Sequence, residues 1–125
     1  MLDAVETIKI LQNQPNSGHV AAGQVIFEAG QAGTEMYGII EGDVEMQVAG
    51  KVVETLQAGD VFGEGALVHL DHKRDSTAIA KTDCHLAMLD QHHFLFAIQS
   101  TPMFAVTVMR SYSDRLRRLK HLLQN

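Results

Sequence analysis

Residues 59–80 hold the side chains of this sequence whose types and spacing are best suited to binding chemistry. Gly63 and Gly65 flank Glu64, and Arg74 follows ten residues after the glutamate. Small residues let backbone N–H groups approach an anion, and a guanidinium binds two phosphate oxygens as a fork. A carboxylate beside such a site is suited to accept a hydrogen bond from a sugar hydroxyl. The segment therefore indicates a ribose-phosphate site, although a surface ion pair between Glu64 and Arg74 is the simpler explanation of these residues alone.

Short runs rich in Val, Ile, Tyr and Phe, divided by glycines, must position this segment. They occupy the chain from His19 to Asp90 and predict a β-sandwich or barrel. Most of the glycines are expected in turns or bulges, because glycine weakens the interior of a strand. The predicted strands are residues 19–22, 24–28, 35–41, 43–48, 51–57, 76–81 and 84–90.

Helices are predicted at both ends of the chain. Residues 1–14 predict a short N-terminal helix, because apolar side chains recur at helical spacing until residues 14–18 break the pattern. Residues 91–124 predict two C-terminal helices, the first over 91–99 and the second starting at Pro102. The fold class is therefore mainly β, with strands over residues 18–90.

The composition is that of one globular domain, which we expect to cover residues 1–125. Hydrophobic residues make up 46% of the chain and charged residues 20%. No apolar run approaches the roughly 20 residues that a membrane span requires, and the first 20 residues do not fit a secretory signal. The single Cys84 cannot form an internal disulfide, which favours a cytoplasmic location.

Positive charge is concentrated at the C-terminus. The net charge is −5, yet five of the ten Lys and Arg residues stand in the last sixteen positions. The acidic body argues against nucleic-acid binding, which depends on neutralising phosphates. A solvated face of the last helix is the favoured interpretation of the basic residues. They are Arg110, Arg115, Arg117, Arg118 and Lys120.

The last helix also has an apolar stripe. Its members are four, three, four, three and four positions apart, as in a coiled-coil seam. The stripe predicts a homodimer through this helix, while packing on the strands explains it equally well. Its residues are Ala105, Met109, Tyr112, Leu116, Leu119 and Leu123.

Neither a metal site nor a catalytic centre is predicted. Seven histidines are present, and His69 and His72 lie near the segment described first, but no Cys or carboxylate frame stands at fitting spacing. Cys84 is expected to be a small buried side chain, since no His-Asn or His-Asp arrangement accompanies it. We therefore expect no cofactor and no enzyme activity.

The order of several segments resembles one known family. Residues 22–30, 36–42 and 56–64, followed by Arg74 and Pro102, closely resemble the cyclic-nucleotide-binding domain family, which includes the bacterial catabolite activator protein and the regulatory subunits of protein kinase A. The resemblance extends over about residues 15–120. The catabolite-activator branch is especially similar, because it shares the Glu-to-Arg spacing of ten and the Ala-Lys-Thr-x-Cys run found here at residues 80–84.

The resemblance implies a double-stranded β-helix, or jelly-roll barrel, with a phosphate-binding cassette at residues 62–77. It implies that Glu64 accepts the ribose 2′-hydroxyl and that Arg74 pairs with the cyclic phosphate. Backbone N–H groups around Gly63 and Ala66 would complete the cradle. The expected ligand-binding residues are Gly63, Glu64, Gly65, Ala66, Arg74, Asp75 and Ser76.

Asp75 departs from the family, which usually has Ser, Thr or Ala at this position. A carboxylate about 6 Å from a phosphate charge costs on the order of 3 kcal/mol at an effective dielectric of about 20, or about a hundredfold in affinity. The penalty shrinks if Asp75 turns outward or pairs with Lys73, or if Ser76 supplies a hydroxyl instead.

The last helix departs as well. Where the catabolite-activator branch places adjacent hydroxyls against adenine, this chain has Leu119 and Lys120, so the choice between cyclic AMP and cyclic GMP stays open. Leu116, Leu119 and Lys120 are candidates for a lid over the base. The family's helix-turn-helix normally begins soon after this helix, and the sequence ends at Asn125, so no DNA-binding domain is expected.

Two functions follow as hypotheses. In the first, cyclic AMP or cyclic GMP binds the cassette and shifts the C-terminal helices, changing dimer packing or contact with an effector protein. In the second, Asp75 has removed ligand binding, and the domain is a dimerisation or docking scaffold. A metal enzyme of the double-stranded β-helix type would need inward-facing His and Glu ligands, and none is apparent.

Overall fold

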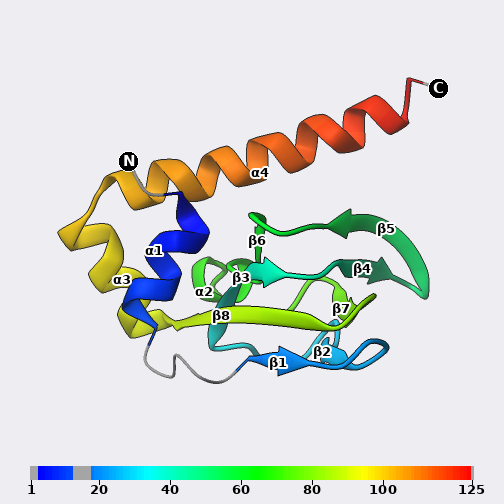
Figure 1. Cartoon of the computed structure of the whole chain (residues 1–125), viewed down its shortest axis with the longest axis horizontal. Coiled ribbons are helices and arrows are strands. Elements are labelled where there is room, and N and C mark those ends of the chain that lie inside the picture. Colours follow the sequence, from blue (N-terminus) through cyan, green and yellow to red (C-terminus); the bar gives the residue numbers. More distant parts are fainter. Residues whose placement is uncertain (1–2, 13–17, 125) are drawn as a thin grey trace.

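The computed structural model describes residues 3–12 and 18–124 (Figure 1). Its helices are α1 (Ala4–Leu11), α2 (Gly65–Val68), α3 (Gln91–Ser100) and α4 (Met103–Leu122). Its strands are β1 (His19–Val20), β2 (Val25–Phe27), β3 (Glu35–Glu41), β4 (Val44–Val48), β5 (Lys51–Leu56), β6 (Val61–Phe62), β7 (Thr77–Ala80) and β8 (Cys84–Asp90). None of the described helices is both long and apolar enough to cross a membrane.

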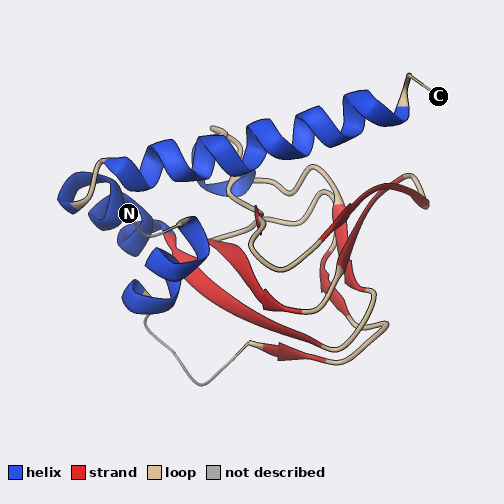
Figure 2. Ribbon diagram, turned by 45° about the horizontal axis from the view of Figure 1, so that its top comes forward, coloured by secondary structure: helices blue, strands red, loops and turns tan. Residues whose placement is uncertain are grey.

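The strands form two four-stranded sheets in which every pairing is antiparallel. One sheet has the order β1-β8-β3-β6 and the other β2-β7-β4-β5. The longest ladder joins β3 to β8, with Tyr37 opposite Met88 and Gly38 opposite Ala87. Figure 2 shows the strands gathered on one side of the molecule and the helices lying along the other. The prediction of a mainly β fold with helices at both ends is confirmed.

Each of the seven predicted strands coincides with an observed one, and their limits differ by no more than two residues. The sequence analysis missed β6, which consists of Val61 and Phe62 only. Both side chains are completely buried, and Gly63 directly after them has a φ of +83°, which favours glycine. Two residues are too few to show the alternation that predicts a strand.

The predicted helices also occur, with limits that differ by up to three residues. α1 lies within the predicted 1–14, and Asp3 caps it by accepting a hydrogen bond from the Glu6 amide at 2.8 Å. The residues expected to end it, 14–17, lie outside the described part of the chain. Asp90 caps α3 in the same manner through the His93 amide. The apolar run after Gly65 forms α2, which was not predicted as a helix.

Two apolar clusters form the core. The first packs α1, α3 and the beginning of α4 onto β3 and β8, with Ile8, Phe94 and Phe104 at its centre. The second fills the space between the sheets and includes Phe27 and Phe62. Some side chains of β3 thus pack against the helices, and the others point between the sheets, as the alternation of a strand requires.

α4 changes its mode of packing along its length. In its first half Phe104, Thr107 and Val108 are buried, whereas in its second half Arg115 is the buried residue. Figure 1 shows α4 passing over α1 and α3 and then above β6 and β5. The second half is therefore held over the sheets by something other than an apolar core.

Candidate functional site

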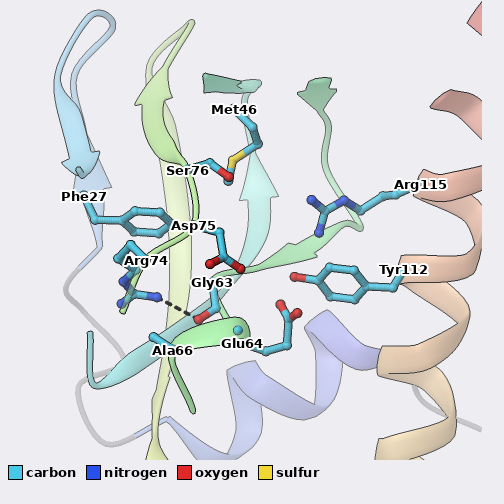
Figure 3. Close-up of a pocket in the computed structure, with 11 residues that line it drawn as sticks. Phe27, Met46, Gly63, Glu64, Ala66, Arg74, Asp75, Ser76, Tyr112 and Arg115 are labelled. Atoms are coloured by element: carbon cyan, nitrogen blue, oxygen red, sulfur yellow. Dashed lines mark hydrogen bonds between the residues drawn. The ribbon is translucent and has the colours of Figure 1, made fainter. Parts of the chain in front are cut away.

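A pocket of about 190 Å³ lies between the segment 62–77 and the second half of α4 (Figure 3). All seven residues that the sequence analysis chose as ligand-binding candidates line it. They are Gly63, Glu64, Gly65, Ala66, Arg74, Asp75 and Ser76. Four further residues from other elements complete the lining, namely Phe27, Met46, Tyr112 and Arg115.

Arg74 is held rigidly at one end of this pocket. It is 6% exposed, and its Nη1 and Nη2 donate to the carbonyl oxygens of Gly63 at 2.7 Å and Glu35 at 2.8 Å. The guanidinium lies 4.1 Å from the centre of the Phe27 ring. A guanidinium has five N–H donors, and the bonds to Gly63 and Glu35 use two of them, so donors remain for an anion. The buried Nε has no hydrogen-bond partner in the described residues.

Gly33 makes room for this arginine. A Cβ atom at Gly33 would collide with Nε and Cζ of Arg74. Desolvation by the surrounding side chains lowers the pKa of Arg74, although not enough to remove its charge at any ordinary pH. The sequence analysis counted Gly33 among turn glycines and did not connect it with Arg74.

Glu64 is the second fixed group of the pocket. Burial raises the pKa of its carboxyl to about 7, against smaller opposing effects of a backbone hydrogen bond, Arg115 and His69. Its Oε2 atom is buried and has no hydrogen-bond partner among the described residues. A buried oxygen without a partner is costly, so this position is suited to receive a donor from a ligand.

Asp75 does face the pocket, and Lys73 is not its partner. Its carboxylate Oδ2 lies 3.3 Å from Nε2 of His69, and the Asp75 side chain is 75% exposed. In the view of Figure 3 it stands between Arg74 and Glu64. Of the arrangements that would reduce the penalty, a pair with Lys73 is not formed, because the loop after α2 brings His69 to Asp75 instead.

The side chains proposed as a lid over the base lie elsewhere. Leu116 and Leu119 line a neighbouring groove of about 440 Å³. Its other lining residues are Glu54, Met109, Ser113, Tyr112 and Arg115, of which the last two also line the pocket. Lys120 is exposed and lines neither cavity. The groove adjoins the pocket, since Tyr112 and Arg115 line both, and Leu116 and Leu119 follow one helical turn later on the same side of α4.

Arg115 is a site residue that the sequence analysis missed. It binds both carboxylate oxygens of Glu54, at 2.7 and 2.8 Å, and donates from Nη1 to the Val61 carbonyl at 2.8 Å. Its guanidinium lies 4.3 Å from the centre of the Tyr112 ring. A signal existed in the strand, because Glu54 is two residues from the buried Leu56 and so shares its inward face.

The remaining chemical candidates form no site of their own. Among the described residues no group of three or more His, Cys, Asp or Glu side chains could hold a metal ion. Cys84 is 4% exposed, and its thiol contacts the carbonyl oxygens of Asp43 and Thr82, as expected of a small buried side chain. Burial raises the pKa of this thiol, which makes it a poorer nucleophile.

Comparison with known proteins decides the family. A family model described as the cyclic nucleotide-binding domain matches residues 18–101, more than half of the chain. The chain belongs to the cyclic nucleotide-binding domain family. The match includes the strands of both sheets and the whole segment 62–77, and it ends at the close of α3.

Members of this family that are similar to the chain occur in varied proteins. The cAMP-dependent protein kinase regulatory subunit of Schizosaccharomyces pombe is 42% identical over 74 residues, which is 58% of this chain and 18% of that protein. The first six curated relatives are much longer than their matched segments, which span between 7% and 26% of their lengths. The segment similar to this chain is thus a minor part of each of these longer proteins.

Two solved structures of this cyclic nucleotide-binding fold are similar over nearly the whole chain. A protein of a cyclic-GMP-dependent signalling pathway that regulates bacterial phytopathogenesis has a TM-score of 0.75 and 25% identity, covering 90% of each chain. The catabolite activator protein of Thermus thermophilus has a TM-score of 0.73 and 25% identity, covering 97% of this chain and 57% of that one. The 97% coverage by the Thermus protein extends over most of α4, which the family model leaves out.

Proposed function

We propose that this domain binds a cyclic nucleotide, cyclic AMP or cyclic GMP, in the pocket between segment 62–77 and α4, and thereby regulates a partner. The observation that carries the proposal is the convergence of Arg74 and Glu64 on one pocket, each with unused hydrogen-bonding capacity. Relatives named for cyclic AMP and a structural neighbour named for cyclic GMP support both choices of base.

The two groups fit complementary parts of such a ligand. The remaining N–H donors of Arg74 bind the cyclic phosphate, and the unpaired Oε2 of Glu64 accepts the ribose 2′-hydroxyl. Gly65 and Ala66 begin a helix, where backbone N–H groups lack intrahelical acceptors and add donors to the cradle. Tyr112 faces the pocket from α4 and replaces the leucine lid as the candidate to cover the base.

Ligand binding is coupled to α4 through Arg115. This residue lines the pocket and also joins α4 to Glu54 and Val61, so a ligand that fills the pocket bears directly on the contacts that hold the helix. A ligand shifts such an equilibrium only to the extent that it binds one helix arrangement better than the other. Movement of α4 would then alter a homodimer through its exposed apolar stripe or the contact with an effector protein.

Several structural expectations belong to this proposal. Residues 1–125 act as one domain, and the two sheets close into a jelly-roll barrel around the second core cluster. The chain performs binding and not catalysis, in the cytoplasm, and requires no cofactor or metal. The larger proteins in which related domains occur make coupling to another activity a natural role for such a domain.

A ligand-free scaffold is the second candidate, and Asp75 favours it. Its carboxylate and that of Glu64 both line the pocket, so a phosphate entering it meets two acidic groups. Under this alternative the domain contributes only its exposed helix surface to dimerisation or docking.

The first experiment is the melting temperature with and without millimolar cyclic AMP or cyclic GMP. A ligand that binds only the folded state stabilises it by about 2.7 kcal/mol at a hundredfold excess over Kd. A rise of several degrees with one nucleotide supports the sensor and identifies the base. The rise should disappear in Arg74→Leu and in Glu64→Ala. No rise with either nucleotide, confirmed by calorimetric titration, would favour the scaffold.

A further inference from the structure

The pocket presents an electrostatic problem for an anionic ligand. Glu64 and Asp75 both line it, and of its two cationic residues Arg115 is paired with the Glu54 carboxylate, which leaves Arg74 to balance the charge of a ligand. A phosphate placed near Arg74 therefore lies close to the carboxylate of the next residue, Asp75. Like charges at such a distance repel each other appreciably unless something neutralises one of them.

His69 stands where such a neutralising group is needed. Its Nε2 lies 3.3 Å from Oδ2 of Asp75, from the position that ends α2. The imidazole is not part of the pocket lining and meets Asp75 from outside it. Protonated imidazole donates a charge-assisted hydrogen bond to a carboxylate, whereas neutral imidazole leaves the carboxylate its full charge.

Gly65 allows the two side chains to meet. A Cβ atom there would lie 3.3 Å from Cδ2 of His69, which is closer than most Cβ contacts, and 3.6 Å from Oδ2 of Asp75, which is an ordinary contact distance. The pair therefore lies close to the backbone of the cassette at Gly65, which itself lines the pocket.

We propose that His69 is a positioning residue for the nucleotide, which pairs in its protonated form with Asp75 and so lets the phosphate bind beside Arg74. The proposal rests on the function proposed above and names a regulation of that same site. Binding of the ligand then favours uptake of one proton by His69, and by reciprocity acidification favours binding. We expect the affinity to be roughly tenfold higher at pH 6 than at pH 8.

Other charged groups surround His69 and Asp75, and their effects on ligand binding must be distinguished from the effect of this pair. Glu64 is itself sensitive near neutral pH, since burial raises the pKa of its carboxyl to about 7. His72 is engaged through Nδ1 with the Ala66 carbonyl at 2.9 Å. The remaining titratable or charged neighbours on the loop and around the pocket are Asp71, Lys73, Arg74, Tyr112 and Arg115.

The contact between His69 and Asp75 is too exposed to be tested by measuring the free energy of unfolding. Their side chains are 55% and 75% exposed, and ion pairs of that kind contribute little to folding. Ligand binding excludes water from the pocket and makes the same charges matter more. A binding measurement is therefore the decisive one, with a pH profile that a purely structural histidine would not alter.

The test is calorimetric titration of cyclic AMP and cyclic GMP at pH 6 and pH 8 with four proteins and one control. Wild type should bind about tenfold more tightly at pH 6. His69→Gln should bind weakly at both pH values, as wild type does at pH 8, and Asp75→Ser should bind at least as tightly as wild type at both. In the Asp75→Ser background, His69→Gln should have no further effect. His92→Gln, an exposed histidine on α3, should follow wild type.

Two outcomes overturn the role of His69 while leaving the nucleotide site intact. In the first, His69→Gln has the same affinities as wild type at both pH values. In the second, Asp75→Ser keeps the pH dependence of wild type, which would assign that pH dependence to Glu64. Absence of binding by every folded protein, Asp75→Ser included, would instead overturn the proposed function and this inference with it. Circular dichroism of each variant at both pH values establishes that it is folded.

Discussion

Arg115 of α4 and Glu54 of β5 form a two-point ion pair, with Nε 2.7 Å from Oε1 and Nη2 2.8 Å from Oε2. The two side chains are only 9% and 11% exposed. A second pair joins Arg118 to Asp60 at 2.7 Å, and Ser111 accepts a hydrogen bond from the backbone of β6. The second half of α4 is thus held to the sheets by polar contacts, which can be exchanged for others more readily than an apolar core.

We expect Arg115→Met to lower the free energy of unfolding by about 3 kcal/mol, because it leaves the Glu54 carboxylate buried without its partner. Urea unfolding followed by circular dichroism measures the change. Arg117→Met, on the exposed face of the same helix, should change stability by less than about 0.5 kcal/mol.

The double variant Glu54→Leu with Arg115→Met tests whether Arg115 and Glu54 stabilise the fold as a pair or each through its own packing. Removing both charges should restore much of the stability lost in the single variant, since two buried apolar groups replace the buried pair. A loss in the double variant equal to the sum of the two single losses would contradict the coupling between Arg115 and Glu54.

Most of the fold could be predicted from the sequence because its signals are local. Alternation and glycine spacing located seven strands, and Pro102 located the start of α4. β6 escaped because it has only two residues, between turns. Pairing order was not accessible from such patterns, since the neighbours β3 and β8 are separated by more than forty residues.

The residues of the candidate site likewise fall into those that could be predicted from the sequence and those that could not. The seven residues of segment 62–77 could be chosen together because they lie within one short segment that resembles a known cassette. Phe27, Met46 and Arg115 reach the pocket from β2, β4 and α4, and nothing in their local sequence indicates that meeting. His69 as the partner of Asp75 likewise depends on the path of the loop after α2.

Gly33→Ala should weaken nucleotide binding at least tenfold, because the added methyl group displaces the guanidinium of Arg74 from its place over Phe27. Titration with the nucleotide that stabilises wild type measures this loss. In an Arg74→Leu background the same change should have no further effect on binding, as expected of two residues that act through one contact. Equal losses from Gly33→Ala in both backgrounds would show that it acts elsewhere.

Glu64 should make the unliganded protein less stable as the pH rises. Its folded-state pKa of about 7 lies above the ordinary 4.5, so the unfolded chain loses this proton first. The stabilising contribution of the proton is complete below about pH 4.5 and is lost as the pH rises to about 7. Since the side chain is not entirely buried, we expect a loss on the order of 2 kcal/mol.

Glu64→Gln isolates that contribution, because glutamine has nearly the same shape and does not titrate. Denaturant unfolding at pH 5 and pH 8 should show the stability of the variant, relative to wild type, increasing between the two values. A constant difference would mean that the folded protein holds Glu64 with an ordinary pKa. Saturating ligand should reduce the pH effect in wild type, since a ribose hydroxyl supplies the partner that Oε2 lacks.

Leu116→Glu should abolish the proposed homodimer. Met109, Leu116 and Leu123 are 63%, 53% and 87% exposed along one stripe of α4, an amount of exposed apolar surface that a second copy of the helix would cover. A glutamate in the middle of that seam would be buried without a partner, so the variant should sediment as a monomer at micromolar concentration while wild type sediments as a dimer. Arg117→Glu makes a larger change in charge one residue further along and should keep the wild-type mass. If both variants and wild type sediment alike, the apolar stripe serves another contact and α4 does not form the seam.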